Sequence, residues 1–345
     1  MSEIPSALGY RWPAEWEPHV ATWVSWPHNR ETWPGNFDVI PGCFAELVKT
    51  IARFEPVHIL AGGAAVMADA AKHVGDHPNV KLYDIETNDA WCRDHGPIFL
   101  GGAQKVAAPS AIVDWEYNAW GGKYPPFDKD NEVPCRIASL EDRRRFTPGI
   151  VLEGGSIEGN GRGTVLTTES CLLNPNRNPH LTRARAESFL ADYLGATNVL
   201  WLGRGELAGD DTDGHIDQLA RFVNPSTVVA GWEDDRADRN HEPLLANFEQ
   251  LSQMTDQDGA PFKVVRLPLP TPQFYEGHRL PACYCNFYMT NGGIIVPQFN
   301  DPGDEQAIRI LQDLSPDREV VGVTSLNLVR GLGSFHCLTQ QEPAC

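Results

Sequence analysis

The stretch HLTRARAESFLADYLGATNVLWL, residues 180–202, contains the unit that decides the fold. His180 to Leu194 is predicted to form a helix, and Gly195 follows it at the usual place for a helix end. The short apolar run Asn198 to Leu202 is then typical of a buried strand. A helix followed closely by a buried strand is the basic unit of α/β proteins.

The same order of helix and strand recurs along the chain. Apolar residues at helical spacing predict a helix over residues 41–54, and a strand is predicted directly after it at 57–60. The last three predicted helices begin about 60 residues apart, which is the mark of an internal repeat. The complete set of helix–strand pairs is 41–54 with 57–60, 64–74 with 80–85, 180–194 with 198–202, 242–254 with 263–269, and 304–314 with 319–323.

Hairpin-like stretches lie between these pairs. Each consists of two runs of β-forming residues around a short turn sequence such as Asn160-Gly161 or Asn291-Gly292-Gly293. Turns of this chemistry predict β-hairpins. The four predicted hairpins span residues 98–108 around Gly101-Gly102, 156–168, 219–230 around Asn224-Pro225, and 287–296.

The repeat predicts an α/β fold of about five β-rich units, each with an outer helix. Two arrangements satisfy it, a closed ring of units or an open α/β sheet with hairpin insertions. The Pro-rich stretch 123–134 is predicted to be an ordered surface loop, because Tyr124 and Phe127 give it side chains to bury. No segment resembles an interdomain linker, so we expect one domain, residues 1–345.

The chain is strongly acidic. Its 28 Lys and Arg against 46 Asp and Glu give a net charge of −18, which argues against nucleic acid and anionic membranes as partners. The apolar runs fall short of the roughly 18 residues of a membrane helix, and residues 1–5 do not resemble a secretory signal. The eight scattered cysteines are predicted to be free thiols. We expect a cytoplasmic globular protein, with a homo-oligomer compatible with the sequence.

Chemically capable side chains follow the inner strand of four units. If the units close around an axis, the loops that carry them face one another. That arrangement would bring a thiol, a histidine, several carboxylates and an aromatic ring together. The four loops are residues 88–97, 152–156, 210–217 and 331–337.

Each candidate residue also has a purely structural interpretation. Cys337 could be an inert buried thiol, but it follows a glycine-rich loop through which the backbone can approach a ligand closely. His215 and Asp217 are two residues apart, which on a strand places both side chains on one face, where histidine can serve as acid or base. The remaining candidates could equally be a turn cap, a core residue and a solvated carboxylate: Asp94, Trp91 and Glu153.

Together these residue types suit attack on a guanidinium group. That group is planar and cationic, so carboxylates can bind it in bidentate fashion and an indole face can stack on it. Its carbon is a poor electrophile, which calls for a strong nucleophile such as a thiolate. A cationic substrate favours the thiolate, and a histidine can protonate departing ammonia and then deprotonate water.

Five motifs in this order extend from the first twenty residues to the last ten. They are Pro13–His19, Asn88–Asp94, Leu152–Gly155, Thr212–Asp217 and His336–Gln341. In these motifs the sequence resembles the agmatine deiminase family, and the resemblance covers essentially the whole chain.

The resemblance implies a fold and a reaction. The fold is the five-bladed α/β propeller (pentein) of the guanidino-group-modifying superfamily, with pseudo-fivefold repeats of ββαβ type around a central active site. The reaction is hydrolysis of agmatine to N-carbamoylputrescine and ammonia, through a covalent cysteine amidino intermediate and without a metal or an organic cofactor. The implied partner is therefore a small cationic guanidino substrate.

The resemblance also assigns roles to individual residues. Cys337 is implied to be the nucleophile, and His215 the general acid and base. Asp94 and Asp217 are implied to hold the guanidinium nitrogens. The remaining roles are assistance in binding and stacking at the site, and they fall to Glu153 and Trp91.

Two segments differ from the family pattern and bear on the substrate. The glycine run before the His-Cys pair is broken at residues 331–335, and residues 205–211 depart from the usual sequence. The diamine-like tail of agmatine would require an acid such as Asp211 or Asp213. A substrate with a carboxylate, such as arginine or peptidyl-arginine, would give citrulline and would require a base: Arg93, Arg204 or Arg330.

A second class of hypothesis is a binding module without catalysis. His215, Asp217, His336, Cys337 and the pair Cys283-x-Cys285 include zinc-compatible ligands, but their spacing matches no common zinc motif. The Cys283-x-Cys285 pair is more simply two small residues on one face of a strand. A non-catalytic guanidino-binding protein is the other alternative, although binding alone has no use for Cys337.

Overall fold

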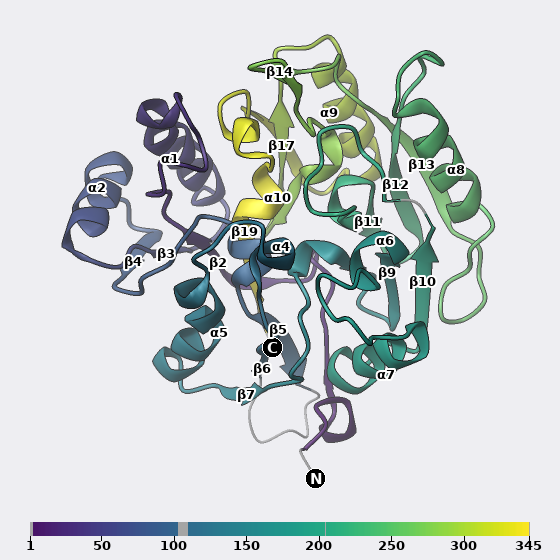
Figure 1. Ribbon diagram of the computed structural model, residues 1–345, viewed down its shortest axis with the longest axis horizontal. Helices are drawn as coiled ribbons and strands as arrows, with labels where there is room; N and C mark the ends of the chain where they lie inside the picture. The colour runs from purple at the N-terminus through teal and green to yellow at the C-terminus, as the bar shows by residue number, and fades with distance from the viewer. Residues whose placement is uncertain (1–2, 103–109, 204, 345) are drawn as a thin grey trace.

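The computed structural model describes residues 3–102, 110–203 and 205–344. In this part of the chain the strands form five sheets of three or four strands and one separate two-stranded hairpin. Figure 1 shows the longer helices at the periphery and helix α10 (Phe335–Leu338) near the centre. The chain is therefore a mixed α/β protein.

The five larger sheets share one pattern. In each, two strands pair antiparallel, and a further strand joins one of them in parallel after a helix on the outside. A parallel neighbour requires a crossover connection, which the helix supplies. The connecting helices are α1 (Ile40–Ile51), α5 (Asp128–Leu140), α7 (Arg183–Leu194), α8 (His241–Leu251) and α9 (Gly303–Leu314).

The strand orders follow from this pattern. One four-stranded sheet is β19 (Thr339–Pro343), β2 (His19–Ser25), β3 (Val57–Leu60) and β4 (Val80–Tyr83); the other is β1 (Tyr10–Arg11), β5 (Ile98–Gly102), β6 (Ser110–Val113) and β7 (Arg144–Phe146). The three-stranded sheets are β8 (Ile157–Gly159), β9 (Thr164–Thr168) and β10 (Asn198–Leu202); β11 (Ala220–Asn224), β12 (Thr227–Trp232) and β13 (Lys263–Pro268); and β16 (Tyr288–Thr290), β17 (Gly293–Gln298) and β18 (Glu319–Thr324). The separate hairpin pairs β14 (Phe274–Tyr275) with β15 (His278–Arg279).

Short elements complete the chain. The remaining α-helices are α2 (Ala64–Val74), α3 (Cys92–His95), α4 (Ala119–Gly122) and α6 (Glu169–Leu172). Single turns of 3₁₀ helix are η1 (Ser6–Leu8), η2 (Phe37–Val39), η3 (Gly154–Ser156), η4 (Ile216–Gln218), η5 (Tyr284–Asn286) and η6 (Leu328–Gly331).

Five of these short turns stand at equivalent places. Each of α3, η3, η4, η5 and α10 comes directly before the first strand of an antiparallel pair or within two residues of it. Each turn contacts the next, and α10 also contacts α3, so the contacts close on themselves. The turns therefore bring five distant parts of the sequence together.

The predicted helix–strand repeat is confirmed. The predicted strand 57–60, helix 64–74 and strand 198–202 have the observed bounds, and the other predicted pairs differ at their ends by a few residues. Hairpins are also found at the predicted places around residues 160, 224 and 291.

Two predictions are wrong in detail. Gly101 and Gly102 are not a turn but lie within β5, where they pair with β1. The connection from β5 to β6 falls at residues 103–109, outside the described residues. The stretch 123–134 is a loop only as far as Phe127, because α5 begins at Asp128 and contains Pro134.

The apolar face of α5 explains why a proline is tolerated there. Val133, Ile137 and Ala138 are buried and pack in a cluster that includes Leu60 and Phe99. Proline removes one helical hydrogen bond, but burial of this face stabilises the helix around it.

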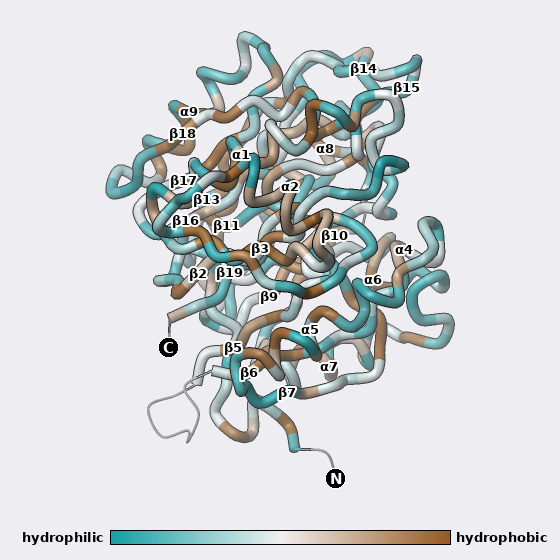
Figure 2. The backbone as a smooth tube through the Cα atoms, turned by 90° about the vertical axis from the view of Figure 1, so that its left-hand side faces the viewer, coloured by the Kyte–Doolittle hydropathy of each residue, from teal (hydrophilic) through white to brown (hydrophobic). Residues whose placement is uncertain are grey.

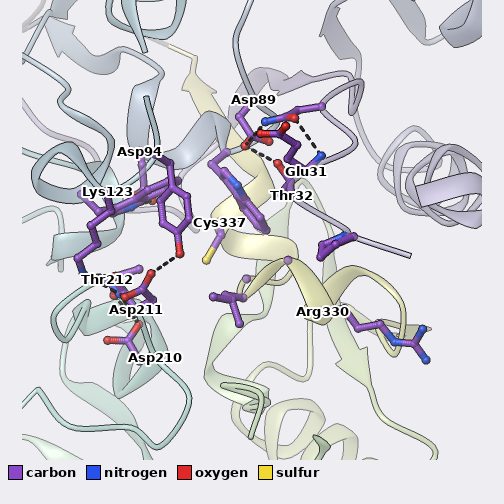
Figure 3. A pocket seen from close by; sticks show the side chains of 18 of the residues that line it. Glu31, Thr32, Asp89, Asp94, Lys123, Asp210, Asp211, Thr212, Arg330 and Cys337 are labelled. Atoms are coloured by element: carbon purple, nitrogen blue, oxygen red, sulfur yellow. Dashed lines mark hydrogen bonds and ion pairs between the residues drawn. The ribbon is translucent and has the colours of Figure 1, made fainter. Parts of the chain in front are cut away.

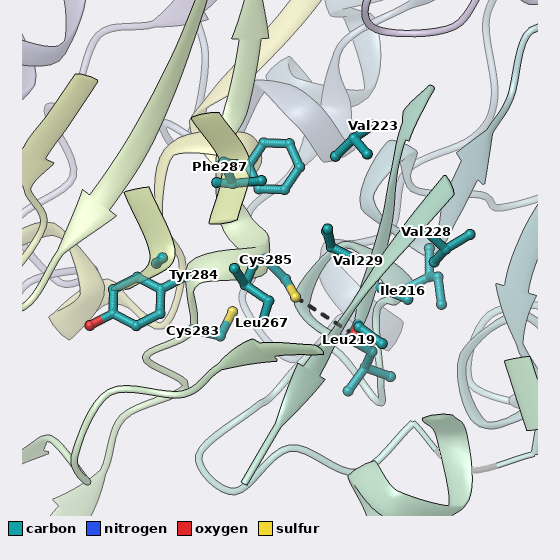
Figure 4. Packing of buried hydrophobic residues seen from close by; sticks show 14 of the residues in the cluster. Ile216, Leu219, Val223, Val228, Val229, Leu267, Cys283, Tyr284, Cys285 and Phe287 are labelled. Atoms are coloured by element: carbon teal, nitrogen blue, oxygen red, sulfur yellow. Dashed lines mark hydrogen bonds between the residues drawn. The ribbon is translucent and has the colours of Figure 1, made fainter. Parts of the chain in front are cut away.

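The hydrophobic core lies among the sheets and the helices that cover them. Figure 2 shows hydrophobic stretches along α1, β3 and β9. The cluster in Figure 4 joins β11 and β12 to the η5 turn through side chains such as Phe287, Val229 and Leu267. No helix in the described ranges is both long enough and apolar enough to span a bilayer.

Candidate active site

A deep cavity of about 990 Å³ opens above the ring of short turns. Cys337, Trp91 and Asp94 are among the residues that line it. Figure 3 shows the Cys337 side chain directed into this cavity, with Asp94 to one side and Asp211 across from it. The size and the mixed polar and aromatic lining are those of a small-molecule site.

The cavity contains the predicted thiol. Cys337 is nearly buried on α10, and its Sγ lies 3.2 Å from Asn286 Nδ2 and 3.7 Å from Asp217 Oδ2. Burial, together with the negative charges of Asp217 and Asp94, raises the pKa of the Cys337 thiol well above its usual value. In the empty cavity the group is therefore a thiol at neutral pH.

Gly155 marks the point where three predicted side chains converge. A Cβ atom added at this glycine would lie 2.6 Å from His215 Nδ1, 2.8 Å from Asp94 Oδ1 and 3.1 Å from Asp217 Oδ2. The η3 turn can pass between these groups only because residue 155 has no side chain. The geometry therefore brings His215, Asp94 and Asp217 into one small volume.

His215 is fully buried behind the cavity wall rather than on a strand. It precedes the η4 turn that carries Asp217, so the predicted spacing on a strand face is wrong, although both side chains reach the same site. Its Nδ1 lies 3.7 Å from Asp94 Oδ1 and its Nε2 3.8 Å from Glu153 Oε2. Burial lowers the pKa of His215, but Asp94, Cys171 and Glu153 outweigh it and raise the pKa well above its ordinary value.

Asp94 has two hydrogen-bond donors. Trp120 Nε1 donates to its Oδ2 and the Gly155 amide to its Oδ1, each at 3.0 Å. Burial, with the negative charges of Asp217 and Glu153, raises the pKa of Asp94. A cation bound beside it would favour the ionised form.

Asp217 has the opposite balance. Burial would raise its pKa, but the hydrogen bond from His336 Nδ1 at 2.7 Å and the positive charges of His336, His215 and Arg221 lower the pKa below its usual range. Its Oδ1 is buried and has no hydrogen-bond partner. One oxygen is thus held in place and the other is free to accept from a ligand.

Glu153 is held by an arginine that the sequence analysis did not single out. Arg177 Nε donates to Glu153 Oε1 at 2.7 Å, and both side chains are about 1 % exposed. Burial would raise the pKa of Glu153, but His215 and Arg177 together lower it. Glu153 is therefore an ionised neighbour of the His215 ring.

The two predicted tail-binding acids differ in position. Asp211 lines the cavity and accepts hydrogen bonds from Tyr124 and Lys123. Asp213 does not line it, because Arg177 and Asn176 hold its carboxylate. Asp211 remains a candidate for contact with a ligand, and the structure gives Asp213 a structural role.

Trp91 forms part of the cavity wall, and the glycines beside it explain the broken glycine run. Gly331 and Gly333 lie so close to the indole that a Cβ at either position would meet Trp91 carbon atoms. Leu332 between them has φ +71° and lines the cavity. The glycines that Trp91 requires are thus present, and the residue that interrupts them faces the ligand space.

The three arginines proposed for a substrate carboxylate are not equivalent. Arg93 is 2 % exposed and is held by Gln341, Glu15 and the His336 carbonyl. Arg330 lines the cavity, with its guanidinium 4.6 Å from the centre of the Tyr275 ring. Arg204 lies outside the described residues.

Asn286 and Trp120 also belong to the site, although the sequence gave little sign of them. Asn286 lies on η5, the one turn of the five for which the sequence analysis proposed no catalytic residue. The repeat itself was the available signal, because it predicts a fifth loop at this place. Trp120 has φ +55°, a backbone conformation that side-chain chemistry does not reveal.

Among the described residues, Glu153, Cys171 and His215 form the group whose ligand atoms could surround a metal ion. Arg177 already holds Glu153, so we assign no metal to this group. The predicted pair Cys283-x-Cys285 belongs to the η5 turn rather than a strand, and Cys285 Sγ instead lies 3.7 Å from the Leu219 carbonyl.

The fold and this site define an α/β protein with a thiol, a histidine and carboxylates around a cavity. The family model of Porphyromonas-type peptidyl-arginine deiminase matches residues 11–343. The agmatine deiminase of Pseudomonas putida is 39 % identical over 100 % of this chain and 98 % of its own. That of Pseudomonas aeruginosa is 40 % identical over 99 % and 98 %.

Solved structures agree. The agmatine deiminase of Enterococcus faecalis superposes with a TM-score of 0.92 at 34 % identity, over 99 % of this chain and 98 % of that one. A substrate-bound agmatine deiminase of C. jejuni gives 0.88 at 32 %, over 96 % of each chain. The chain therefore belongs to the agmatine deiminase family, among the Porphyromonas-type peptidyl-arginine deiminases.

Proposed function

We propose that the protein is a hydrolase of linear amidines that converts agmatine and water to N-carbamoylputrescine and ammonia. The observation that carries this proposal is the convergence of His215, Asp94 and Asp217 around Gly155, with the Cys337 thiol 3.7 Å from Asp217. The full-length relatives at about 40 % identity that are agmatine deiminases support the same reaction.

The acids bind and orient the guanidinium. Asp94 and the free Oδ1 of Asp217 accept hydrogen bonds from its nitrogens, while Trp91 covers the planar group. The positive charge of the substrate lowers the pKa of Cys337, which the two carboxylates otherwise raise. Substrate binding thus generates the thiolate that attacks it.

The reaction then proceeds in two halves. The Cys337 thiolate forms a C–S bond to the guanidinium carbon, and the C–N bond breaks as His215 gives a proton to the departing ammonia. In the second half His215 takes a proton from water, whose oxygen attacks the same carbon. The C–S bond breaks, the sulfur leaves as thiolate, and the ureido product is released.

The arrangement of the chain that we propose is a single domain, residues 1–345, in which five units of ββαβ type form a propeller around the site. The shared pattern of the five larger sheets supports this arrangement. The contacts that run through α3, η3, η4, η5 and α10 and return to α3 support it further.

We place the reaction in the cytoplasm. The seven described cysteines are free thiols, which suits a reducing compartment. A homo-oligomer stays a prediction.

Asp211 supports agmatine as the substrate, because its carboxylate lines the cavity where the amine of a diamine tail could lie. Arg330 favours the alternative, a substrate with a carboxylate such as arginine or peptidyl-arginine.

Assay of ureido product from agmatine, free arginine, dimethylarginine and a peptide with a terminal arginine separates the two. We expect the highest kcat/KM with agmatine. A higher kcat/KM with any arginine substrate would contradict the assignment.

A further inference from the structure

A second histidine lies directly beside the nucleophile in the sequence and has no part in the proposed chemistry. The His336 side chain is about 2 % exposed, and both of its ring nitrogens face carboxylates. Nδ1 lies 2.7 Å from Asp217 Oδ2, and Nε2 lies 2.8 Å from Glu15 Oε2. A neutral imidazole has a hydrogen on only one nitrogen, so only the imidazolium can donate to both.

Glu15 belongs to the N-terminal motif Pro13–His19, which the proposed mechanism does not use. Arg221 Nη2 lies 2.8 Å and Arg93 Nη2 3.4 Å from its Oε2, and the Met289 amide donates to its Oε1 at 2.7 Å. Burial would raise the pKa of Glu15, but Arg221, His336 and Arg93 lower it far below the usual range. Glu15 is therefore a fixed anion at the far side of the His336 ring.

The charges around His336 balance only when it is protonated. The carboxylates in this buried group are Glu15, Asp217 and Glu158, and Glu158 accepts from Arg221 Nε at 2.9 Å. The arginines are Arg221 and Arg93. With a neutral His336, three acids would face two cations in a volume without solvent, and an uncompensated buried charge is costly.

We propose that His336 is a positioning residue, an imidazolium held between Glu15 and Asp217 that fixes the Asp217 carboxylate for the substrate. It donates to Oδ2, which leaves Oδ1 turned toward the guanidinium, and it keeps Asp217 ionised next to Cys337. Glu15 acts through His336 in turn, so the N-terminal motif serves the site at a distance. This role rests on the proposed function.

The variants His336→Gln and Glu15→Gln test the role. Glutamine has no charge and cannot donate to both carboxylates, so in His336→Gln burial should raise the pKa of Asp217. A group whose pKa rises is protonated as the pH falls, so activity should be lost at acidic pH first. We expect kcat/KM for agmatine near pH 6 to fall about 100-fold, and the acid limb of the pH profile to move up by about one unit or more.

Glu15→Gln should move the acid limb in the same direction by a smaller amount, because His336 keeps one carboxylate. It also keeps the proposal testable if His336→Gln fails to fold. The matched control is His19→Gln, since His19 is buried, pairs with Glu55 at 3.0 Å and touches neither Asp217 nor Cys337 in the described contacts. We expect His19→Gln to lower the unfolding temperature and leave the acid limb in place.

The outcomes separate the two proposals. A folded His336→Gln or Glu15→Gln variant with the wild-type acid limb overturns the positioning role and leaves the deiminase assignment intact. The same shift in His19→Gln as in His336→Gln also overturns it, because any buried histidine would then have the effect. A wild-type protein that releases no ammonia from agmatine overturns the proposed function, and the role of His336 with it.

Discussion

The α10 and η5 turns are equivalent in the fold, and each carries a buried cysteine. On α10 the Cys337 thiol faces the cavity. On η5 the Cys285 thiol faces the core and lies 3.7 Å from the Leu219 carbonyl, as Figure 4 shows, while the neighbouring Asn286 faces the site. Consecutive side chains on a helical turn point in different directions, so the register of the turn decides which residue reaches the cavity.

Burial acts on both thiols in the same sense. It raises the pKa of Cys285 to about 12, and it raises the pKa of Cys337 well above the usual value. Burial therefore does not distinguish a nucleophile from a core residue. The distinction lies in what else the sulfur faces, which for Cys337 is a cavity that can admit a cation.

The largest expected effect follows from replacing the two cysteines in turn. Cys337→Ala should reduce kcat for agmatine by about 10⁴-fold or more, because no other group can form the covalent intermediate. Cys285→Ala should keep kcat within a small factor. Ammonia release, with circular dichroism as the check on folding, measures both. Wild-type turnover by Cys337→Ala would show that the nucleophile is another residue.

Replacing an acid near each turn compares binding with support. Asp94→Asn should lower kcat/KM by about 10²- to 10³-fold, because a charged contact to the guanidinium is lost. The control is Asp304→Asn, since Asp304 is buried and accepts from Tyr284 on η5 at 2.7 Å. It should lower the free energy of unfolding by about 1–2 kcal/mol with little change in kcat/KM. Equal kinetic losses in the two variants would contradict the role of Asp94.

The reactivity of the thiols without substrate tests the pKa of Cys337. Only the thiolate reacts with iodoacetamide, so alkylation of Cys337 should increase about tenfold per pH unit below the raised pKa. It should still be increasing above about pH 9, where an ordinary thiol of pKa about 8.5 has levelled off. Mass spectrometry of each cysteine follows this, and Cys285 should stay unmodified in the folded protein. A plateau near pH 8.5 for Cys337 would be the contrary result.

The smallest effect is expected at the side chain that joins the two turns. Asn286→Ala removes the donor to Cys337 Sγ and to Asp217, and we expect kcat to fall about tenfold. Asn291→Ala is the control in the same sheet, because its side chain bonds to His19 backbone groups away from the cavity. It should affect stability alone. A larger kinetic loss in Asn291→Ala would exclude a specific role for Asn286.

Much of the fold could be predicted because the repeat is written in local patterns. The helix 64–74 and the strand 198–202 are stated by spacing and by helix ends such as Gly195. The errors came where distant residues intervene. Gly101 and Gly102 look like a turn, but pairing with Tyr10 and Arg11 extends them into a strand.

The candidate site could be predicted in part for a similar reason. Cys337, His215 and Asp94 have uncommon chemistry, and their loops occupy equivalent places in the repeat. Asn286 and Arg177 have common side chains whose importance depends on partners far away in sequence, Cys337 and Glu153 respectively. No local pattern could have identified them.

The sequence by itself determined the α/β repeat, the acidic charge and the residue types for guanidinium chemistry, because these depend on spacing and composition. Only the tertiary structure decided that Asp211 lines the cavity while Asp213 is held by Arg177, and that Cys337 rather than Cys285 faces a ligand. The physical reason is that the direction of a side chain in a short turn, and the charges around it, are set by contacts between elements far apart in the chain.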